Sequence, residues 1–223
     1  MATDALMATH TDADLLTIAQ WLSPAFPVGA YSHSHGLETA VQSGSVHDAT
    51  TLGDWVETVI RHGSGKSDAL FLSAAYRAGT PARLWEVDAI ARAFAPSKER
   101  LVEAVQQGTA FSKAVAAAWD LDASDLTYPV AVGGAARAQD LPQDSVAQFY
   151  LHAFLSNLVG AGMRMSVLGQ TAGQTLIRDL SPLCISIAED TKHGNLDDLS
   201  GTAFLADIAS MKHETQYSRI FRT

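Results

Sequence analysis

Residues 48–63 of the chain read DATTLGDWVETVIRHG, and this stretch decides the class of fold. Its apolar residues follow the i, i+3, i+4, i+7, i+8 pattern: Leu52, Trp55, Val56, Val59 and Ile60. Such spacing puts one apolar stripe along one face of an α-helix. Asp48 is suited to cap the first turn, and Gly63 is suited to end the last. The stretch therefore predicts an amphipathic helix that packs against a core.

Helical signals continue on both sides of this stretch, whereas strand-like alternation is nearly absent. The expected helices cover residues 14–22, 34–44, 67–76, a stretch from Thr80-Pro81, 97–119, a stretch from Tyr128-Pro129, 146–177, a stretch from Pro182 to near 194, and 200–213. Short connections between helices favour antiparallel neighbours. We therefore predict one compact all-α domain of eight to ten helices over residues 13–211. A flexible N-terminal tail (residues 1–12) and a C-terminal tail (residues 212–223) flank it.

The composition narrows the class of function. The chain has 223 residues, a formal net charge of -9 and a single cysteine, Cys184. An acidic surface is repelled by nucleic acid and by anionic lipid, so we expect neither as a partner. The N-terminus lacks the basic residues of a signal peptide, and no apolar run is long enough to span a bilayer. We expect a cytoplasmic protein in which Cys184 is a buried apolar side chain.

Small and aromatic residues give further packing expectations. Four glycines, Gly160, Gly162, Gly169 and Gly173, stand among apolar residues. We expect them to permit close packing within the domain, and a dimer seam is the alternative. The four tryptophans, Trp21, Trp55, Trp85 and Trp119, lie on or near apolar stripes, and we expect them in the core.

Several fragments resemble catalytic motifs but have the wrong spacing. Residues 63–67, GSGKS, lack the earlier glycine of a phosphate-binding loop and follow a predicted helix, where that motif follows a strand. His213-Glu214 opens like a zinc-protease helix, but Tyr217 stands where the second histidine is needed. No serine has the glycine neighbours of a nucleophile elbow. The sequence therefore predicts no catalytic residue.

Three blocks of the sequence stand out: residues 23–38, SPAFPVGAYSHSHGLE, residues 128–136, YPVAVGGAA, and residues 211–222, MKHETQYSRIFR. In this order they resemble the SPxxPxGxxSxSxGLE stretch, the YPVAxGxxA block and the HETQYSRLF(R) tail of the UreF family of urease accessory proteins. The resemblance implies an all-helical fold, a homodimer, and a complex with a scaffold protein (UreD or UreH) and a nickel-carrying GTPase (UreG). It further implies that this complex delivers nickel to apo-urease and that the UreF protein modulates the GTPase.

The residue types in the first and last blocks indicate binding to other proteins. Aromatic and arginine side chains carry much of the energy of protein interfaces, and a solvated chain end has little need of them. We predict partner contacts from the two blocks, which we call the opening block (residues 23–38) and the C-terminal tail (residues 212–223). The assigned residues are Pro24, Phe26, Pro27, Tyr31, Lys212, His213, Glu214, Gln216, Tyr217, Ser218, Arg219, Ile220, Phe221 and Arg222. The alternative is that both segments fold onto the protein's own core.

Metal contact is a separate possibility within the opening block. His33, His35 and Glu38 carry donors suited to nickel or zinc, but no complete ligand set stands in the sequence. We expect no tightly bound cofactor, with nickel touching these side chains only in transit. The leading hypothesis is a non-catalytic assembly factor for urease. The alternative is a helical metal carrier or enzyme that uses His33 and His35.

Overall fold

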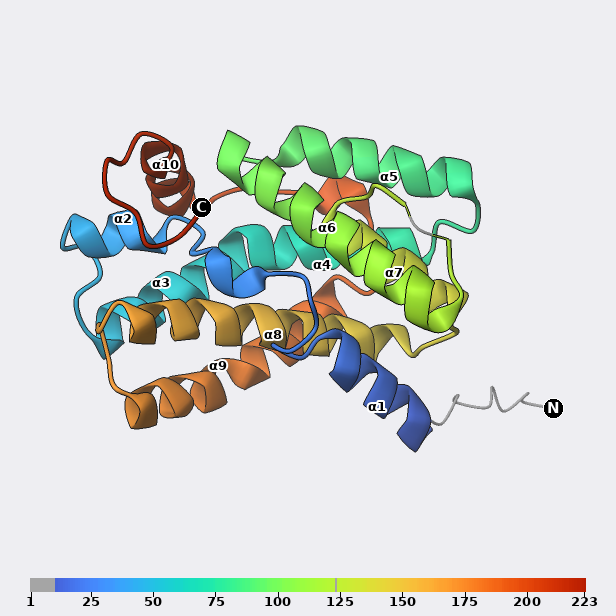
Figure 1. The fold of residues 1–223 in the computed structure, drawn as a ribbon, viewed down its shortest axis with the longest axis horizontal. Coiled ribbons are helices and arrows are strands. Elements are labelled where there is room, and N and C mark those ends of the chain that lie inside the picture. Colours follow the sequence, from blue (N-terminus) through green and yellow to red (C-terminus); the bar gives the residue numbers. More distant parts are fainter. Residues whose placement is uncertain (1–10, 123) are drawn as a thin grey trace.

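The computed structural model describes residues 11–122 and 124–223, which form an all-α domain without strands (Figure 1). Its ten α-helices are α1 (Asp12–Trp21), α2 (Leu37–Gln42), α3 (Ala49–His62), α4 (Ser64–Tyr76), α5 (Pro81–Phe94), α6 (Lys98–Trp119), α7 (Tyr128–Ala138), α8 (Gln143–Arg164), α9 (Gln170–Asp190) and α10 (Phe204–His213). Two 3₁₀ helices, η1 (Ala30–Ser32) and η2 (Leu196–Asp198), complete the list. The predicted fold class and number of helices are confirmed.

Helix α4 lies at the centre of the domain. It contacts α3, α5, α7, α8 and α9, and every residue from Ala69 to Ser73 is buried. Its closest neighbour is α7, where a Cβ on Gly133 would meet the carbonyl oxygen of Leu72. Gly133 of the YPVAVGGAA block therefore serves backbone-to-backbone packing in the core.

Helices α8 and α9 form an antiparallel pair (Figure 1). The predicted helix over residues 146–177 is wrong in one respect, because the chain turns between Met165 and Gly169, with Ser166 at a φ of 61°. Pro182 does not open a helix as predicted but lies inside α9. The buried residues that follow it, Leu183, Cys184 and Ile187, hold that half of α9 on the core despite the missing N–H.

The GSGKS fragment forms the sharp junction between α3 and α4. Both of its glycines are required by packing: a Cβ on Gly65 would lie 2.5 Å from the Cα of Ile60, and one on Gly63 would lie 3.0 Å from the Cβ of Ala203. Because a helix precedes the fragment, the sequence-based rejection of a phosphate-binding loop is confirmed.

The opening block and the segment from α10 to the C-terminus meet on one side of the domain. Helix α10 packs against α2 and α6, and η1 lies on α8. Figure 1 shows α2, α10 and the C-terminus together at one end of the molecule, away from α1. The fold thereby brings the opening block and the C-terminal tail side by side.

Several detailed expectations need adjustment. The predicted N-terminal tail lies outside the described residues as far as residue 10, and Thr11 already caps α1.

Trp21 is buried, and Trp55 and Trp119 pack against the core, but Trp85 is 49% exposed because it lies on the outer side of α5. Gly162 and Gly173 pack against Leu52 and Met163, whereas Gly160 and Gly169 face open space. Close packing is thus confirmed for two of the four glycines, and a dimer seam stays a prediction.

None of the helices in the described part of the chain combines the length and the apolar character that a membrane crossing demands.

Substitutions at two glycines test the close packing of α7 on α4. Gly133→Ala forces α7 away from the carbonyl of Leu72, and we expect a loss of at least about 2 kcal/mol in the free energy of unfolding. Gly160→Ala, inside α8 with no atom near the new methyl group, should instead gain about 0.5–1 kcal/mol. Urea unfolding of both variants provides the measurement, and equal effects at the two sites would contradict this packing.

Candidate functional site

The carboxylate of Glu38 fixes the C-terminal tail to the opening block. Glu38 stands in the first turn of α2 and is buried. Its two oxygens accept the backbone N–H groups of Ile220 at 2.7 Å and Phe221 at 2.9 Å. Gly36 allows the approach, because it has a φ of 76° and a Cβ there would lie 2.6 Å from the backbone N of Ser210 in α10. The Gly-Leu-Glu sequence is therefore explained by the docking of α10 and of the tail.

His213, the last residue of α10, joins the same cluster. Its Nε2 lies 3.2 Å from Glu38 Oε2, and its Nδ1 lies 2.7 Å from Glu99 Oε2. Arg219 from the tail donates to the other oxygen of Glu99 at 2.8 Å. A carboxylate faces each ring nitrogen of the fully buried His213, so both contacts are hydrogen bonds only when the ring carries two protons. His213 thus links Glu38 of α2 to Glu99 of α6 through the interior.

A second buried carboxylate, Glu103 on α6, gathers donors from three parts of the chain. It pairs with Arg100 one turn earlier in α6 and accepts from His35 Nε2 at 2.8 Å. It also accepts from Gln107 Nε2 at 3.0 Å and from Thr223 Oγ1 at 2.8 Å. Burial alone would raise the pKa of Glu103, but Arg100 and His35 outweigh burial and hold that pKa well below its usual range. Glu103 is therefore an ionised anchor for the very end of the tail.

The two histidines of the opening block are both engaged by this anchor. His33 Nδ1 lies 3.0 Å from Thr223 Oγ1, and Ser34 donates to the carbonyl of Thr223 through both its N–H and its hydroxyl at 2.8 Å. Burial, followed by the nearby charge of Arg100, lowers the pKa of His35 to about 4. His35 is therefore neutral at pH 7, with its Nε2 proton donated to Glu103. Its Nδ1 is buried and has no hydrogen-bond partner among the described residues.

The structure does not bring the three predicted nickel contacts into one ligand set. His33 and His35 face Glu103 and Thr223, whereas Glu38 faces the tail. Over residues 11–122 and 124–223, no group of three or more His, Cys, Asp or Glu side chains is arranged to hold a metal ion. Transient contact with nickel stays a prediction, and no feature of the described site favours the alternative of a metal carrier or enzyme.

The C-terminal tail is divided between buried and exposed residues. Phe221, which is 5% exposed, and the buried His213 face the protein's own interior, so their predicted role as surface contacts is corrected. Arg164 stacks on the ring of Phe221 with 4.8 Å between guanidinium carbon and ring centroid. Glu214 accepts the N–H of Lys98, and Gln216 accepts the hydroxyl of Thr39. The tail therefore folds onto the domain, which is the alternative that the sequence left open.

The other part of the tail consists of side chains that are exposed to solvent. Tyr217 has a relative exposure of 105%, and Ile220 is 73% exposed. Lys212, Ser218, Arg219 and Arg222 are exposed as well. Because the backbone of Ile220 is tied to Glu38 while its side chain is exposed, the tail presents apolar groups from a fixed backbone.

The opening block shows a similar division. Tyr31 is 70% exposed, and Pro24 and Pro27 are exposed. Phe26 is half-buried, and its ring lies 5.5 Å from that of Phe111 and 6.4 Å from that of Trp119. The prediction of Phe26 as a partner contact is therefore corrected, because its ring completes the protein's own aromatic core.

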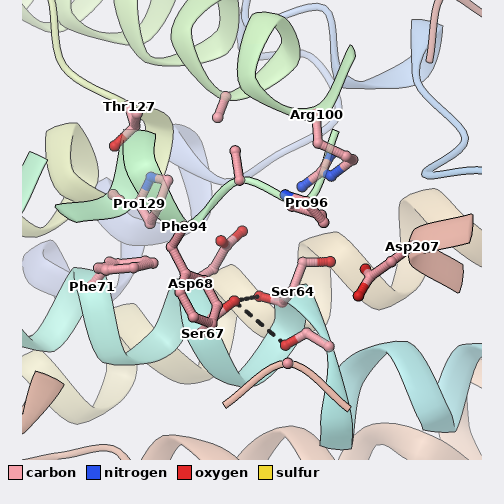
Figure 2. A pocket seen from close by; sticks show the side chains of 15 residues that line it. Ser64, Ser67, Asp68, Phe71, Phe94, Pro96, Arg100, Thr127, Pro129 and Asp207 are labelled. Carbon is pink, nitrogen blue, oxygen red and sulfur yellow. Dashed lines mark hydrogen bonds between the residues drawn. The ribbon is translucent and has the colours of Figure 1, made fainter. Parts of the chain in front are cut away.

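A cavity of about 270 Å³ lies beside this cluster, between α4, α6 and α10 (Figure 2). Asp68 of α4, Arg100 of α6 and Asp207 of α10 form part of its wall. Burial raises the pKa of Asp68 to about 6, although Arg100 and a 2.9 Å hydrogen bond from Tyr150 act in the opposite direction. Burial also raises the pKa of Asp207. Two carboxylates therefore line the cavity, and nearby donors and positive charges do not fully offset the cost of burying them.

Sequence reasoning missed most of the residues that anchor the tail. Arg100, Glu103 and Gln107 occupy the same face of α6 as Phe111 and Val115, all of them buried. Polar residues at positions of an apolar stripe are the signal that was available. Thr223 and Glu99 gave no signal, since each becomes important only through contacts more than 100 positions away in the chain.

Comparisons with known proteins relate the chain to one family. A family model described as UreF matches residues 46–181. The chain is 52% identical to the urease accessory protein UreF of Ruegeria pomeroyi over 97% of this chain and 100% of that protein. It is 53% identical to the protein of the same name from Roseobacter denitrificans, over 96% and 95% of the two chains. The corresponding protein of Rhodopseudomonas palustris strain HaA2 is 43% identical, over 100% and 99%.

Substitution of Glu38 tests its hold on the tail. Glu38→Gln removes the charge that accepts two backbone N–H groups, and we expect a loss of about 1.5–3 kcal/mol in the stability of the docked tail. Trypsin should then cleave after Arg219 and Arg222 faster than in the unmodified protein. Glu57→Gln, which breaks only an exposed pair with Arg61, is the matched control. Equal cleavage rates in all three proteins would show that Glu38 does not hold the tail.

The raised pKa of Asp68 predicts a pH dependence of stability. Because the folded protein holds this proton more tightly than the unfolded chain, the stabilisation is complete below pH 3.8 and is lost as the pH rises through about 6. Asp68→Asn should therefore match the unmodified protein at pH 4 and exceed it above pH 7 by up to about 3 kcal/mol. Urea unfolding at both pH values tests this, and a difference that does not vary with pH would refute it.

Proposed function

The chain belongs to the UreF family of urease accessory proteins, and from that membership we propose that it is an assembly factor required for loading nickel into apo-urease. In this proposal a homodimer bridges a scaffold protein of the UreD or UreH type and a GTPase of the UreG type in the cytoplasm, and it modulates that GTPase. The related proteins are named accessory proteins, and the family is not one of enzymes. The chain therefore acts by binding other proteins.

The observation that carries this proposal is an exposed apolar surface on a fixed support. We call it the α10 surface; it comprises Phe204, Leu205, Ile208, Met211, Tyr217 and Ile220, which are between 44% and 105% exposed. Large apolar side chains concentrated on one exposed segment favour association with another protein. Residues 204, 208 and 211 follow helical spacing on the side of α10 away from Ala209 and His213, which are buried.

The anchoring of the tail makes this surface better suited to binding a partner. Glu38 and Ser32 accept the backbone N–H groups of Ile220, Phe221 and Arg222, and Glu103 accepts the hydroxyl of Thr223. Little conformational entropy therefore remains to be lost around Ile220 when a partner binds. Tyr31 of the opening block lies close by in the fold, because its neighbour Ser32 accepts the N–H of Arg222 at 2.8 Å. The opening block and the tail thus offer one composite contact area to the scaffold protein or the GTPase.

Nickel enters this proposal as cargo. The side chains assigned to transient contact, His33, His35 and Glu38, are all buried in the described structure and hydrogen-bonded to the tail or to Glu103. Contact between nickel and His33 Nδ1 therefore requires Thr223 to leave its place. Partner binding that moves the tail would provide such an opening.

A double substitution separates the α10 surface from the fold. Tyr217→Ala with Ile220→Ala removes two exposed side chains and should leave the free energy of unfolding within about 0.5 kcal/mol. We expect a loss of at least about 1.4 kcal/mol in partner affinity, which is a tenfold weaker complex. Urease that is co-expressed with this variant and the other accessory proteins should therefore contain less nickel per active site. Metal analysis and activity of the purified urease provide the measurement.

The matched control is Trp85→Ala, which removes an exposed aromatic residue from α5, outside the α10 surface. It should leave nickel loading unchanged. Full loading by the double variant would refute the role of Tyr217 and Ile220. Full loading in cells that lack the chain altogether would refute the function itself.

A further inference from the structure

A groove lies between the first turns of α6 and the C-terminal tail. Its volume is about 350 Å³, which is within the range of ligand sites. Helix α6 contributes Lys98 and Val102 to its walls, the tail contributes Arg219 and Arg222, and the buried His33 lies at its bottom. Figure 1 shows the start of α6 beside the C-terminus. We call this space the α6 groove; none of the residues of the α10 surface lines it.

The neighbours of His33 determine where its ring carries a proton. Thr223 has one hydroxyl proton and donates it to Glu103 at 2.8 Å. The contact of 3.0 Å between Thr223 Oγ1 and His33 Nδ1 is therefore a hydrogen bond only if Nδ1 is protonated. Burial lowers the pKa of His33 and outweighs the nearby charge of Glu103, so the ring is neutral at pH 7. In this neutral form Nε2 is a hydrogen-bond acceptor.

This acceptor has no donor in the part of the chain that the structure describes. The His33 side chain is 4% exposed and lines the α6 groove, yet Nε2 is not one of the unpartnered polar atoms that are closed off from solvent. Buried polar groups in proteins are nearly always hydrogen-bonded. A fixed lone pair at the bottom of a groove therefore points to a ligand that brings an N–H or O–H group.

The walls of the groove add positive charge. Neither Lys98 nor Arg222 forms an ion pair or a hydrogen bond through its side chain among the described residues. The acidic side chains of the groove are already engaged: Glu99 pairs with Arg219 through one oxygen and contacts a histidine through the other, and Glu214 accepts the backbone N–H of Lys98. The charges of Lys98 and Arg222 are therefore available to a ligand.

This charge is opposite in sign to that of the chain as a whole. The formal net charge of the chain is -9, whereas residues 212–223 carry three cations, Lys212, Arg219 and Arg222, against one acid, Glu214. Complementary charge steers association and fixes the register of a bound partner. The α6 groove therefore favours an anionic ligand. A metal ion fits less well, because the described residues hold no set of three metal ligands.

The source of the ligand follows from the neighbouring α10 surface. Tyr217 and Ile220 stand on the same tail, between Glu214 and Arg222, which both line the groove. A protein segment can pass from these exposed apolar side chains into the groove, whereas a free anion gains nothing from them. Its backbone N–H groups provide a donor, and aspartate or glutamate side chains provide the negative charge.

We propose that the α6 groove binds an extended acidic segment of a partner protein, with a backbone N–H on His33 Nε2 and carboxylates on Lys98 and Arg222. The inference rests on the proposed function in one respect, namely that a partner occupies the adjacent α10 surface. The apolar surface then supplies most of the affinity, and the groove selects for acidic sequence and fixes its position.

A peptide titration on the purified full chain tests the groove by itself. Acetyl-Glu-Gly-Glu-amide is compared with acetyl-Gln-Gly-Gln-amide, which has nearly the same shape and no charge. Binding is followed by nuclear magnetic resonance through Nε2 of His33 and the amide signals of Lys98 and Arg222. We expect Nε2 to be unprotonated in the free protein and its signal to shift when the acidic peptide binds. The uncharged peptide should bind at least about fivefold more weakly.

Three variants locate the binding. Lys98→Gln and Arg222→Gln each remove one positive charge from an exposed side chain, and each should weaken binding of the acidic peptide at least about threefold. Their unfolding midpoints should equal that of the unmodified protein. Lys113→Gln is the matched control, because Lys113 is also exposed on α6 but does not line the groove. It should leave binding unchanged.

Four outcomes would overturn the proposal. They are equal binding of the two peptides, unchanged binding by both groove variants, a protonated Nε2 in the free protein, and binding of the free dicarboxylate glutarate as tightly as the acidic peptide. The last would assign the groove to small anions in place of a protein segment. Failure here is distinct from failure of the proposed function, because nickel loading of urease can still depend on the chain when no acidic peptide binds.

Discussion

A carboxylate is stable inside a protein only where donors surround it, and Glu38 and Glu103 meet this condition by drawing distant parts of the chain together. Glu38 takes two consecutive backbone N–H groups of the tail, and Glu103 takes Arg100, His35 and Thr223. Without the tail, Glu38 would lose its two backbone donors, and Glu103 would lose Thr223 but keep Arg100 and His35. The docking of the C-terminus is therefore coupled to the burial of Glu38 as well as being a feature of the surface.

This constraint explains how one short segment serves both stability and binding. The backbone of the tail and the side chains of Phe221 and Thr223 satisfy the interior, while Tyr217 and Ile220 stay exposed. The surface offered to a partner is consequently pre-ordered. The same packing places His33 beneath Thr223, so access to the histidines and the position of the tail are physically coupled.

Much of the fold could be predicted from periodicity and from glycine and proline signals, because each depends on local spacing. Asp48, Thr80 and Ser97 cap α3, α5 and α6 as their residue types indicate. The prediction at Pro182 was wrong because tertiary packing keeps α9 helical across a residue that locally breaks helices. The anchoring role of Glu103 was missed for a different reason. Its place on the apolar stripe of α6 indicates burial, but its partners His35 and Thr223 are far away in the sequence. Residue types did identify the two blocks. Only the structure shows that Phe26 and Phe221 pack on the protein's own interior, whereas Tyr31 and Tyr217 are exposed.

Amide hydrogen exchange of the unmodified protein, free of any partner, tests the central claim most directly. If buried carboxylates dock the tail, the N–H groups of Ile220, Phe221 and Arg222 exchange slowly, because they donate to Glu38, Glu38 and Ser32. Those of Tyr217, Ser218 and Arg219 exchange fast. Uniformly fast exchange from Thr215 to Thr223 would contradict the account, since the tail would then be free in the isolated protein and ordered only by a partner.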